Sequence, residues 1–172
     1  MTLLCDLSVD RLKELYAYDP LTGLFTRTET RNFRWKAGSI AGTIRKTGSK
    51  IGYVSIKIDG RLYLAHRLAW IYVNGAWPDG EIDHIDGNAG NNRISNLRVA
   101  SRIVNSQNQR EAPRGKTHSP LFGAHWCKQI NKWKSSIRVN KRVVHLGVFS
   151  TDVDASAAYL SAKRRLHEGC TI

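Results

Sequence analysis

Hydrophobic residues recur at helical or strand spacing along the N-terminal part of the chain. Ser8 is a favourable N-cap and precedes apolar positions that share one face of a helix. Asp59-Gly60 separates two alternating segments and is a strong signal for a β-hairpin. The pattern predicts a helix over 8–17, strands over 24–28, 53–58 and 61–65, and a short buried helix over 66–73.

The C-terminal part has a different pattern, in which three alternating segments precede one longer helical segment. The predicted elements are strands over 123–127, 132–139 and 143–149, and a helix from 152 to about 167, capped by Thr151. Acidic residues in the first turn of this helix and basic residues in its last turn suit the helix dipole. Strand alternation predicts that one set of side chains faces the helix: Trp133, Ser135, Ile137, Val144, Leu146 and Val148.

Between these regions lies a polar segment, 81–109, with the order strand, loop, strand, helix. Its first strand ends in Asp83-His84, and a loop rich in Gly and Asn follows. The second strand runs over about 96–100, and the helix after it carries Asn105. The segment therefore places a carboxylate and an imidazole on one strand and an amide on a helix.

The 172-residue chain has 27 Lys and Arg residues against 14 Asp and Glu residues, a formal net charge of +13 at pH 7. Residues 97–172 hold 14 basic and 4 acidic side chains, whereas residues 1–96 hold 13 and 10. So strong a field of one sign favours binding to a polyanion. An anionic membrane would need an amphipathic helix with a broad apolar face, which the alanine-rich C-terminal helix lacks. Nucleic acid is the expected partner.

Other classes of protein are disfavoured. No uncharged apolar run approaches the ~20 residues that span a bilayer. The first ten residues carry two aspartates and no basic start, unlike a secretory signal. The three cysteines lie far apart without a C-x-x-C pair, which argues against disulfides and structural zinc and fits a reducing cytoplasm.

The polar segment has residue types that phosphodiester hydrolysis requires. A histidine with a pKa near its reference value of ~6.5 can take a proton from water at neutral pH. Asp83 and Asn105 offer hard oxygen donors, which suit Mg²⁺ or Mn²⁺ better than zinc. Two protein ligands would leave the other coordination positions to phosphate oxygens and water.

The ordered set DHIDGN, NNRISNLR and a helix asparagine 22 residues after Asp83 resembles the ββα-metal motif of HNH endonucleases, in the homing branch encoded by phages and introns. The resemblance implies that Asp83 binds the metal and that His84 is the general base. Asn96 would brace the loop and orient the base. Asn105 stands at the position of the final His in the family name and would be the second metal ligand. These four residues are the expected catalytic set.

Alternatives stay open at several positions of this motif. Asn92 and Asn108 are rival candidates for the roles of Asn96 and Asn105. Arg93 is expected either to contact the scissile phosphate or to be solvated. For His66, packing or hydrogen bonding is a better interpretation than catalysis.

Residues 121–172 resemble the DNA-binding domain of plant ethylene-response factors, which also occurs fused to phage homing endonucleases. The matching pieces are Gly123-Ala124-x-Trp126, Lys132-Trp133 through Ile137-Arg138, Leu146-Gly147-x-Phe149, and Ala155-x-x-Ala158-Tyr159-x-x-Ala162. The resemblance implies a curved three-stranded sheet that enters the major groove. The expected DNA contacts are Lys132, Lys134, Ser136, Arg138 and His145 on the sheet, together with Arg93 and with Arg45 and Lys46 of the Gly-rich stretch.

The sequence thus predicts an α+β fold in four parts: a small mixed N-terminal region (1–52), a hairpin with the ββα-metal motif (53–112), a linker (113–120), and a three-stranded antiparallel sheet packed on one helix (121–172). The expected function is site-specific hydrolysis of double-stranded DNA, as a nick or a double-strand cut. The expected enzyme is a monomer or weak dimer in the cytoplasm of a bacterial host that uses Mg²⁺ or Mn²⁺, without an organic cofactor or a membrane. The alternatives are a non-catalytic sequence-specific DNA-binding protein or regulator derived from such an endonuclease, and a basic protein that binds or cuts RNA.

Overall fold

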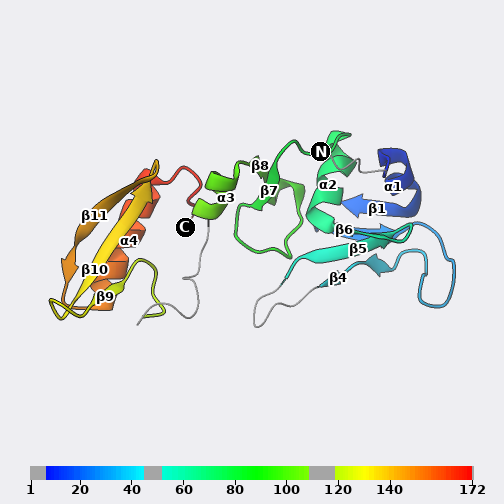
Figure 1. Ribbon diagram of the computed structural model, residues 1–172. Helices are drawn as coiled ribbons and strands as arrows, with labels where there is room; N and C mark the ends of the chain where they lie inside the picture. Colours follow the sequence, from blue (N-terminus) through cyan, green and yellow to red (C-terminus); the bar gives the residue numbers. More distant parts are fainter. Residues whose placement is uncertain (1–6, 45–51, 109–118, 172) are drawn as a thin grey trace. The chain divides into compact units, whose positions relative to one another are not determined.

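The computed structural model describes residues 7–44, 52–108 and 119–171, and it confirms the α+β fold (Figure 1). The chain divides into two compact units, Met1–Ser101 and Arg102–Ile172. Among the described residues, the first unit holds the antiparallel sheets β1-β2-β3, β4-β5-β6 and β7-β8, and the second holds the sheet β11-β10-β9. No helix in the described part of the chain is long and apolar enough to cross a membrane.

The helices and strands predicted for the first unit occur in the predicted order, together with three short strands, over residues 16–19, 40–41 and 43–44, that were not predicted. The elements of this unit are α1 (Val9–Leu15), β1 (Tyr16–Asp19), β2 (Leu24–Arg27), β3 (Ile40–Ala41), β4 (Thr43–Ile44), β5 (Val54–Ile58), β6 (Arg61–Leu64), α2 (Ala65–Asn74), β7 (Glu81–His84), the 3-10 turn η1 (Ile94–Asn96) and β8 (Leu97–Ala100). The first helix ends two residues before its predicted limit of 17. Tyr16 and Ala17 already pair with β2, so sheet pairing outweighs the tendency of these two residues to continue the helix.

One apolar core extends through the whole first unit. Its members come from α1, the N-terminal strands, β5, α2 and the β7-β8 pair, and include Leu12, Leu15, Phe25, Ile56, Leu68, Ile71, Ile82 and Leu97. The strand that carries Asp83-His84 therefore shares its core with the N-terminal hairpin. Burial of these side chains is the main force that holds the polar loop after β7 in place.

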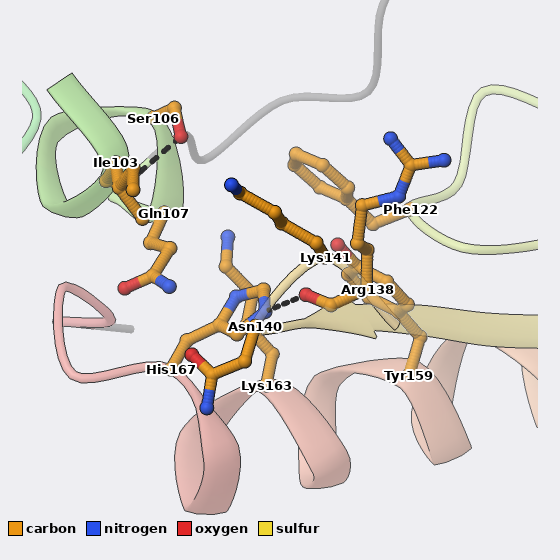
Figure 2. A pocket seen from close by; sticks show the side chains of 10 residues that line it. All are labelled: Ile103, Ser106, Gln107, Phe122, Arg138, Asn140, Lys141, Tyr159, Lys163 and His167. Atoms are coloured by element: carbon orange, nitrogen blue, oxygen red, sulfur yellow. Dashed lines mark hydrogen bonds between the residues drawn. The ribbon is translucent and has the colours of Figure 1, made fainter. Parts of the chain in front are cut away.

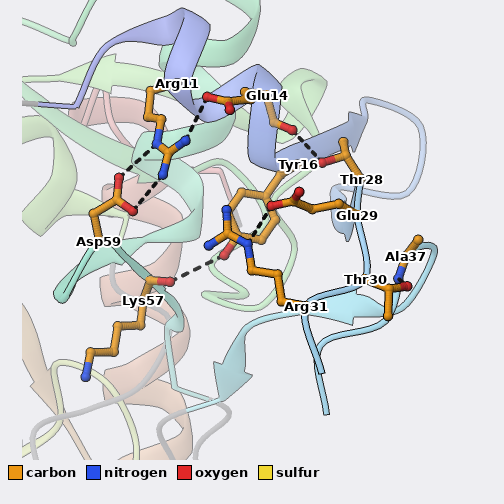
Figure 3. A network of polar contacts seen from close by, with 10 residues as sticks. All are labelled: Arg11, Glu14, Tyr16, Thr28, Glu29, Thr30, Arg31, Ala37, Lys57 and Asp59. Carbon is orange, nitrogen blue, oxygen red and sulfur yellow. Dashed lines mark hydrogen bonds and ion pairs between the residues drawn. The ribbon is translucent and has the colours of Figure 1, made fainter. Parts of the chain in front are cut away.

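A polar network on the surface joins α1 to the β5-β6 hairpin (Figure 3). Asp59 and Gly60 have φ values of 45° and 84°, both left-handed, which confirms the predicted two-residue turn. Arg11 donates from Nε and Nη2 to the two carboxylate oxygens of Asp59, each at 3.0 Å. This bidentate pair lowers the pKa of Asp59 and fixes the hairpin against the helix.

The second unit consists of α3 (Arg102–Gln107), β9 (His125–Cys127), β10 (Lys132–Val139), β11 (Arg142–Phe149) and α4 (Asp152–Leu166). The helix α4 packs on all three strands (Figure 1). Thr151 caps it as predicted, because its Oγ1 accepts the N–H of Asp154 at 3.1 Å. Ala155 and Ala162 are fully buried, so small side chains let the helix lie close to the sheet.

The predicted alternation along β11 is wrong at Val148, because a bulge interrupts it. The register shifts between Ser135, which pairs with Gly147, and Ser136, which pairs with His145. This bulge reverses the facing of later residues, so Val148 lies opposite Lys134 and is 43% exposed instead of facing α4. Val144 pairs with buried Ile137 but is 41% exposed, because β11 is an edge strand. Most of the predicted linker, together with Arg45 and Lys46, lies outside the described residues.

Candidate active site

The pairing of β7 with β8 positions the predicted metal ligand. Asp83 lies directly opposite Arg98 in the register, and cross-strand partners share one face of a sheet. Arg98 donates to Asp83 Oδ2 from Nε at 2.9 Å and contacts it from Nη2 at 2.8 Å. Asp83 is 4% exposed, so this arginine supplies the positive charge that a buried carboxylate requires. Asp83 is thereby fixed in position at the end of β7.

The imidazole of His84 contacts the side chain of Asn92 from the loop. His84 Nε2 lies 3.2 Å from Asn92 Oδ1, and an amide oxygen can only accept a hydrogen bond. Nε2 therefore carries the proton, and Nδ1 has the lone pair of the neutral ring. Of the two candidate asparagines, Asn92 is the one that fixes the tautomer of the predicted base.

His84 is 5% exposed and packs among aromatic rings. The ring of His66 on α2 meets it edge to face at a centroid distance of 5.0 Å, and Tyr53 lies 5.9 Å away. Burial lowers the pKa of His84, although the Asn92 bond and the charges of Asp86 and Asp83 oppose part of that shift. The ring is therefore unprotonated at neutral pH, as a general base must be.

His66 is packed rather than exposed, in line with the interpretation made from the sequence. It is 5% exposed, and burial, followed by the charges of His84 and Arg67, lowers its pKa to about 3. Its Nδ1 has no hydrogen-bond partner among the described residues. His66 is thus a neutral ring that supports one face of the imidazole of His84.

The side chain of Asn96 braces the loop, as the motif implied. Its Oδ1 accepts the N–H of Asp86 at 3.0 Å, and its Nδ2 donates to Asp86 Oδ1 and to the Asn91 carbonyl, each at 2.9 Å. Burial raises the pKa of Asp86, but hydrogen bonds from Asn91, from the Asn88 amide and from Asn96 lower it on balance. The two roles expected of Asn96 are therefore divided: Asn96 holds the loop, and Asn92 holds the base.

The β1-β2 hairpin contacts the loop between β7 and β8 at Asn92 and Arg93. Gly23 has φ +74°, and a Cβ there would lie 2.5 Å from Arg93 N and 2.6 Å from Asn92 C, so only glycine fits. Tyr18 donates its hydroxyl to the Asn92 carbonyl at 2.7 Å, and its burial raises the pKa of Tyr18 to about 12. Arg93, a predicted phosphate contact, donates from Nε to the Leu21 carbonyl. The turn between β1 and β2 therefore fixes the backbone on which Asn92 is carried.

The remaining predicted catalytic residue belongs to the other compact unit. Asn105 is partly buried on α3, which begins directly after Ser101 at the end of β8. Asn108, its rival, is 5% exposed, and its Oδ1 accepts the Thr171 hydroxyl. Asp83, His84, Asn92 and Asn96 are brought together in the first unit, and the sharing of one ion by Asp83 and Asn105 stays a prediction.

The donor chemistry of the proposed ligands suits a hard cation. In the described part of the chain no three His, Cys, Asp or Glu side chains are grouped so that they could hold a metal ion. The predicted pair consists of one carboxylate and one amide, both oxygen donors of the kind that Mg²⁺ and Mn²⁺ prefer. Asp86 adds a second carboxylate to the loop, although its oxygens already accept bonds from Asn88, Asn91 and Asn96.

The predicted DNA contacts on the second unit differ in exposure. Lys132, Arg138 and His145 are exposed, whereas Lys134 and Ser136 are partly buried. Ser136 pairs with His145 across the two long strands, so these two share a face as expected. Burial raises the pKa of the Cys127 thiol, but Lys134 and the backbone around Gln129 and Ile130 lower it on balance. The outer face of this sheet therefore presents exposed basic side chains to solvent.

Comparison with known proteins identifies the central segment. Residues 63–107 match the sequence profile of the family described as HNH endonuclease. The match includes Asp83, His84, Asn96 and Asn105. Residues 63–107 are an HNH endonuclease domain. This HNH domain extends from β6 through α3, so it runs past the point in the chain at which the two compact units divide.

A phage protein is related to part of the chain. "Protein 3.8" of Escherichia phage T7 is 40% identical over 73 residues, which make up 42% of this chain and 59% of the phage protein. The match thus spans less than two thirds of that relative. No solved structure matches the chain.

Several supporting residues of the HNH domain were not foreseen from the sequence. Arg98 could have been found only by fixing the β7-β8 register, which places it opposite Asp83. The roles of Tyr18 and Gly23 depend on contacts more than 65 residues away in the chain, for which the sequence holds no local signal. Asn92 was visible as a candidate, because it belongs to the run of asparagines between the two strands.

Proposed function

We propose that the chain is a metal-dependent endonuclease that hydrolyses phosphodiester bonds of double-stranded DNA, with His84 as general base. The observation that carries this proposal is the contact between His84 Nε2 and Asn92 Oδ1 at 3.2 Å. This contact leaves the lone pair of the His84 ring on Nδ1, and the lowered pKa of His84 keeps the ring neutral. The profile match of residues 63–107 supports the reaction class.

These positions support the following reaction. Nδ1 of His84 takes a proton from a water molecule while the water oxygen forms a bond to phosphorus. The bond from phosphorus to the 3′ oxygen breaks, and that oxygen takes up a proton from solvent. The products carry 5′-phosphate and 3′-hydroxyl ends, as the family resemblance implies. Asn92 orients the base, and Asn96 keeps the loop in the shape that makes this contact.

A divalent ion, when bound, neutralises charge that develops on the phosphate. Asp83 and Asn105 are the proposed ligands, and Mg²⁺ or Mn²⁺ the proposed ion, because both donors are hard oxygens. Arg98 holds the carboxylate of Asp83 at the end of β7, so that the ligand does not depend on the ion for its position.

The second unit is proposed to bind DNA through the outer face of β9–β11. Lys132, Lys134, Ser136, Arg138 and His145 would contact phosphates and bases in the manner of an ethylene-response-factor domain, with Arg93, Arg45 and Lys46 as further contacts. The 14 basic and 4 acidic side chains of residues 97–172 support this assignment. We place the enzyme in the homing class, in the cytoplasm of a phage-infected bacterium, where a monomer with one active site would cut one strand.

The test is cleavage of supercoiled plasmids that carry a randomised insert, with cut ends mapped by sequencing. Wild-type protein with Mg²⁺ or Mn²⁺ should nick the pool, and a chelator should stop the reaction. Asp83→Ala should lose most of the cleavage while retaining DNA binding in a gel shift, and Asp79→Asn, a change at an exposed aspartate, should behave as wild type. Equal loss of binding and cleavage in Asp83→Ala would show that Asp83 has a structural role instead.

One observation favours a second candidate, a non-catalytic DNA-binding protein derived from an endonuclease. His84 is 5% exposed, and the carboxylate of Asp83 is paired with Arg98, so both groups are enclosed by protein. This candidate predicts tight binding to duplex DNA and no nicked product with either metal. A preference for structured RNA over duplex DNA at fixed salt would instead favour an RNA-directed function. A protein that reads the DNA major groove should not show this preference, because side chains cannot enter the major groove of A-form RNA.

A further inference from the structure

The second compact unit contains a pocket of about 570 Å³ between α3, the β10-β11 turn and α4 (Figure 2). This volume lies within the ~300–1,000 Å³ that is usual for small-molecule sites. The helix α3 forms one wall, and the C-terminal tail holds it in place. Gly169 donates its N–H to Gln107 Oε1 at 3.0 Å, and a Cβ at Gly169 would lie 2.2 Å from the Val104 carbonyl oxygen. The close packing of Gly169 on α3 therefore fixes this wall of the pocket.

The pocket is positively charged. Arg138, Lys141 and Lys163 line it, and none of the described residues that line it is acidic. Lys163 is 2% exposed, and its ammonium lies 4.6 Å from the ring centroid of Phe122. Figure 2 shows Lys141 and Lys163 reaching into the space between α3 and the sheet. The site therefore favours an anionic ligand.

Another part of the pocket lining is aromatic. The rings of Phe122 and Tyr159 are parallel within 3°, with centroids 5.7 Å apart. Tyr159 lies directly on the backbone of Gly123, where a Cβ would be 2.2 Å from the ring, so glycine is required for this packing. The two rings are thereby held rigidly in an offset stack, which leaves part of each aromatic ring to contact a planar group.

The left-handed backbone conformation of Lys141 is a second observation in favour of a ligand contact by this side chain. Asn140 and Lys141 have φ values of 48° and 67°, the two left-handed positions of a two-residue hairpin turn. Glycine is the residue favoured at the second of these positions, and a lysine there is conformationally strained. The chain has glycine at the matching position of its other such turn, Gly60. Strain of this kind is typical of positions at which the side chain contacts a ligand.

We infer that this pocket binds a nucleotide, with the base against the Phe122–Tyr159 pair and the phosphate between Lys141 and Lys163. A simple anion would not use the aromatic pair, and an uncharged planar ligand would not use the two lysines. The nucleotide is either free in solution or an unpaired nucleotide of a nucleic acid strand, since both offer the same base and phosphate. This assignment does not depend on nuclease activity, because no residue of the first unit takes part.

The test is isothermal titration calorimetry of the full chain with deoxyadenosine monophosphate and, as a ligand without a base, deoxyribose 5-phosphate. The nucleotide should bind at least tenfold more tightly than the base-free ligand. Lys141→Gly should weaken nucleotide binding at least tenfold while the melting temperature stays level or rises, because glycine suits the turn. Lys128→Ala removes an exposed lysine outside the pocket and should leave the affinity within twofold of wild type.

The second possible ligand, an unpaired nucleotide within a strand, is tested with two single-stranded probes. One is an otherwise abasic strand that carries a single base at its centre, and the other is the same strand without that base. If only the base-carrying strand binds, and Lys141→Gly removes the preference for the base, the ligand is a nucleotide within a strand. Equal binding of base-containing and base-free ligands in both formats would overturn the proposal. Weakening of binding by the same factor in Lys141→Gly and Lys128→Ala would also overturn it. A lack of any binding would overturn it as well.

Discussion

The loop between β7 and β8 and the outer face of the C-terminal sheet are both rich in polar residues, but they use them in opposite ways. In the loop, Asn92 and Asn96 are buried, and their amides hold His84 and Asp86. On the sheet, Lys132 and Arg138 are exposed to solvent. Buried amides fix a geometry, and exposed cations supply an electrostatic field. The loop is therefore suited to chemistry at a single phosphate, and the sheet is suited to attracting many phosphates.

The same difference predicts how each region tolerates substitution. A buried polar group that loses its partner keeps its full desolvation cost, about 1–3 kcal/mol, whereas an exposed charge contributes little to stability. Changes in the loop should therefore affect folding and catalysis, and changes on the sheet should affect binding alone.

Asn96→Ala should have the largest effect on the loop. The substitution removes three side-chain hydrogen bonds, two of them to Asp86, so the free energy of unfolding should fall by about 3 kcal/mol. Urea denaturation measures this change. Asn88→Ala, in the exposed part of the same loop, is the matched control and should cost less than about 1 kcal/mol. Similar losses in the two variants would contradict the bracing role of Asn96.

Asn92→Ala should affect the base more than the fold. The Asn92 contact raises the pKa of His84, so its removal should lower that pKa and move the acid limb of the pH–rate profile for nicking to lower pH. The rate at neutral pH should fall by about tenfold or more, because the tautomer is no longer fixed. Single-turnover nicking from pH 5 to 8 measures both. An unshifted acid limb with a reduced rate would assign Asn92 to loop structure alone.

Stability should depend on pH through His66. Its pKa is about 3 in the folded state and near 6.5 when unfolded, so between these values the unfolded chain binds more protons. Stability is therefore complete above about pH 6.5 and declines as the pH falls toward 3. His84, Arg67 and Tyr53 are the neighbouring groups that contribute to this environment. Melting temperatures of wild type and His66→Leu across this range should diverge, and parallel curves would contradict the assignment.

The smallest effect is expected on the sheet. Lys132→Gln should leave the melting temperature unchanged, since the side chain is exposed. It should reduce the slope of log affinity against log salt for duplex DNA by about one unit, the value for one lost phosphate contact. Lys128→Ala provides the comparison, and a fluorescence titration at several salt concentrations measures both. If the slope of Lys132→Gln equals that of wild type, Lys132 does not contact a phosphate.

Local signals were sufficient for much of the fold. The Asp59-Gly60 turn, the Ser8 and Thr151 caps and the motif around Asp83-His84 depend on neighbouring residues, and each lies where the pattern predicted. What the sequence could not show depends on distant contacts. The bulge on β11 is set by the pairing of two strands, and the pattern of one strand cannot reveal it.

The same limit applies to the candidate site. Asp83, His84 and Asn96 could be predicted because their order in the chain carries the motif. The division of roles between Asn92 and Asn96 could not, because it depends on which amide oxygen reaches Nε2. The support that Gly23 gives to the loop was equally hidden, since a glycine in a turn is common and only the folded chain shows what it contacts.

The most direct test of the account is the single-turnover nicking rate of His84→Ala, compared with wild type on the same plasmid pool with Mg²⁺ or Mn²⁺. We expect a loss of about 10²–10⁴-fold, the usual contribution of a general base, at a temperature at which the variant stays folded and binds duplex DNA as wild type does. A variant that nicks at the wild-type rate would contradict the central claim that His84 takes the proton from water.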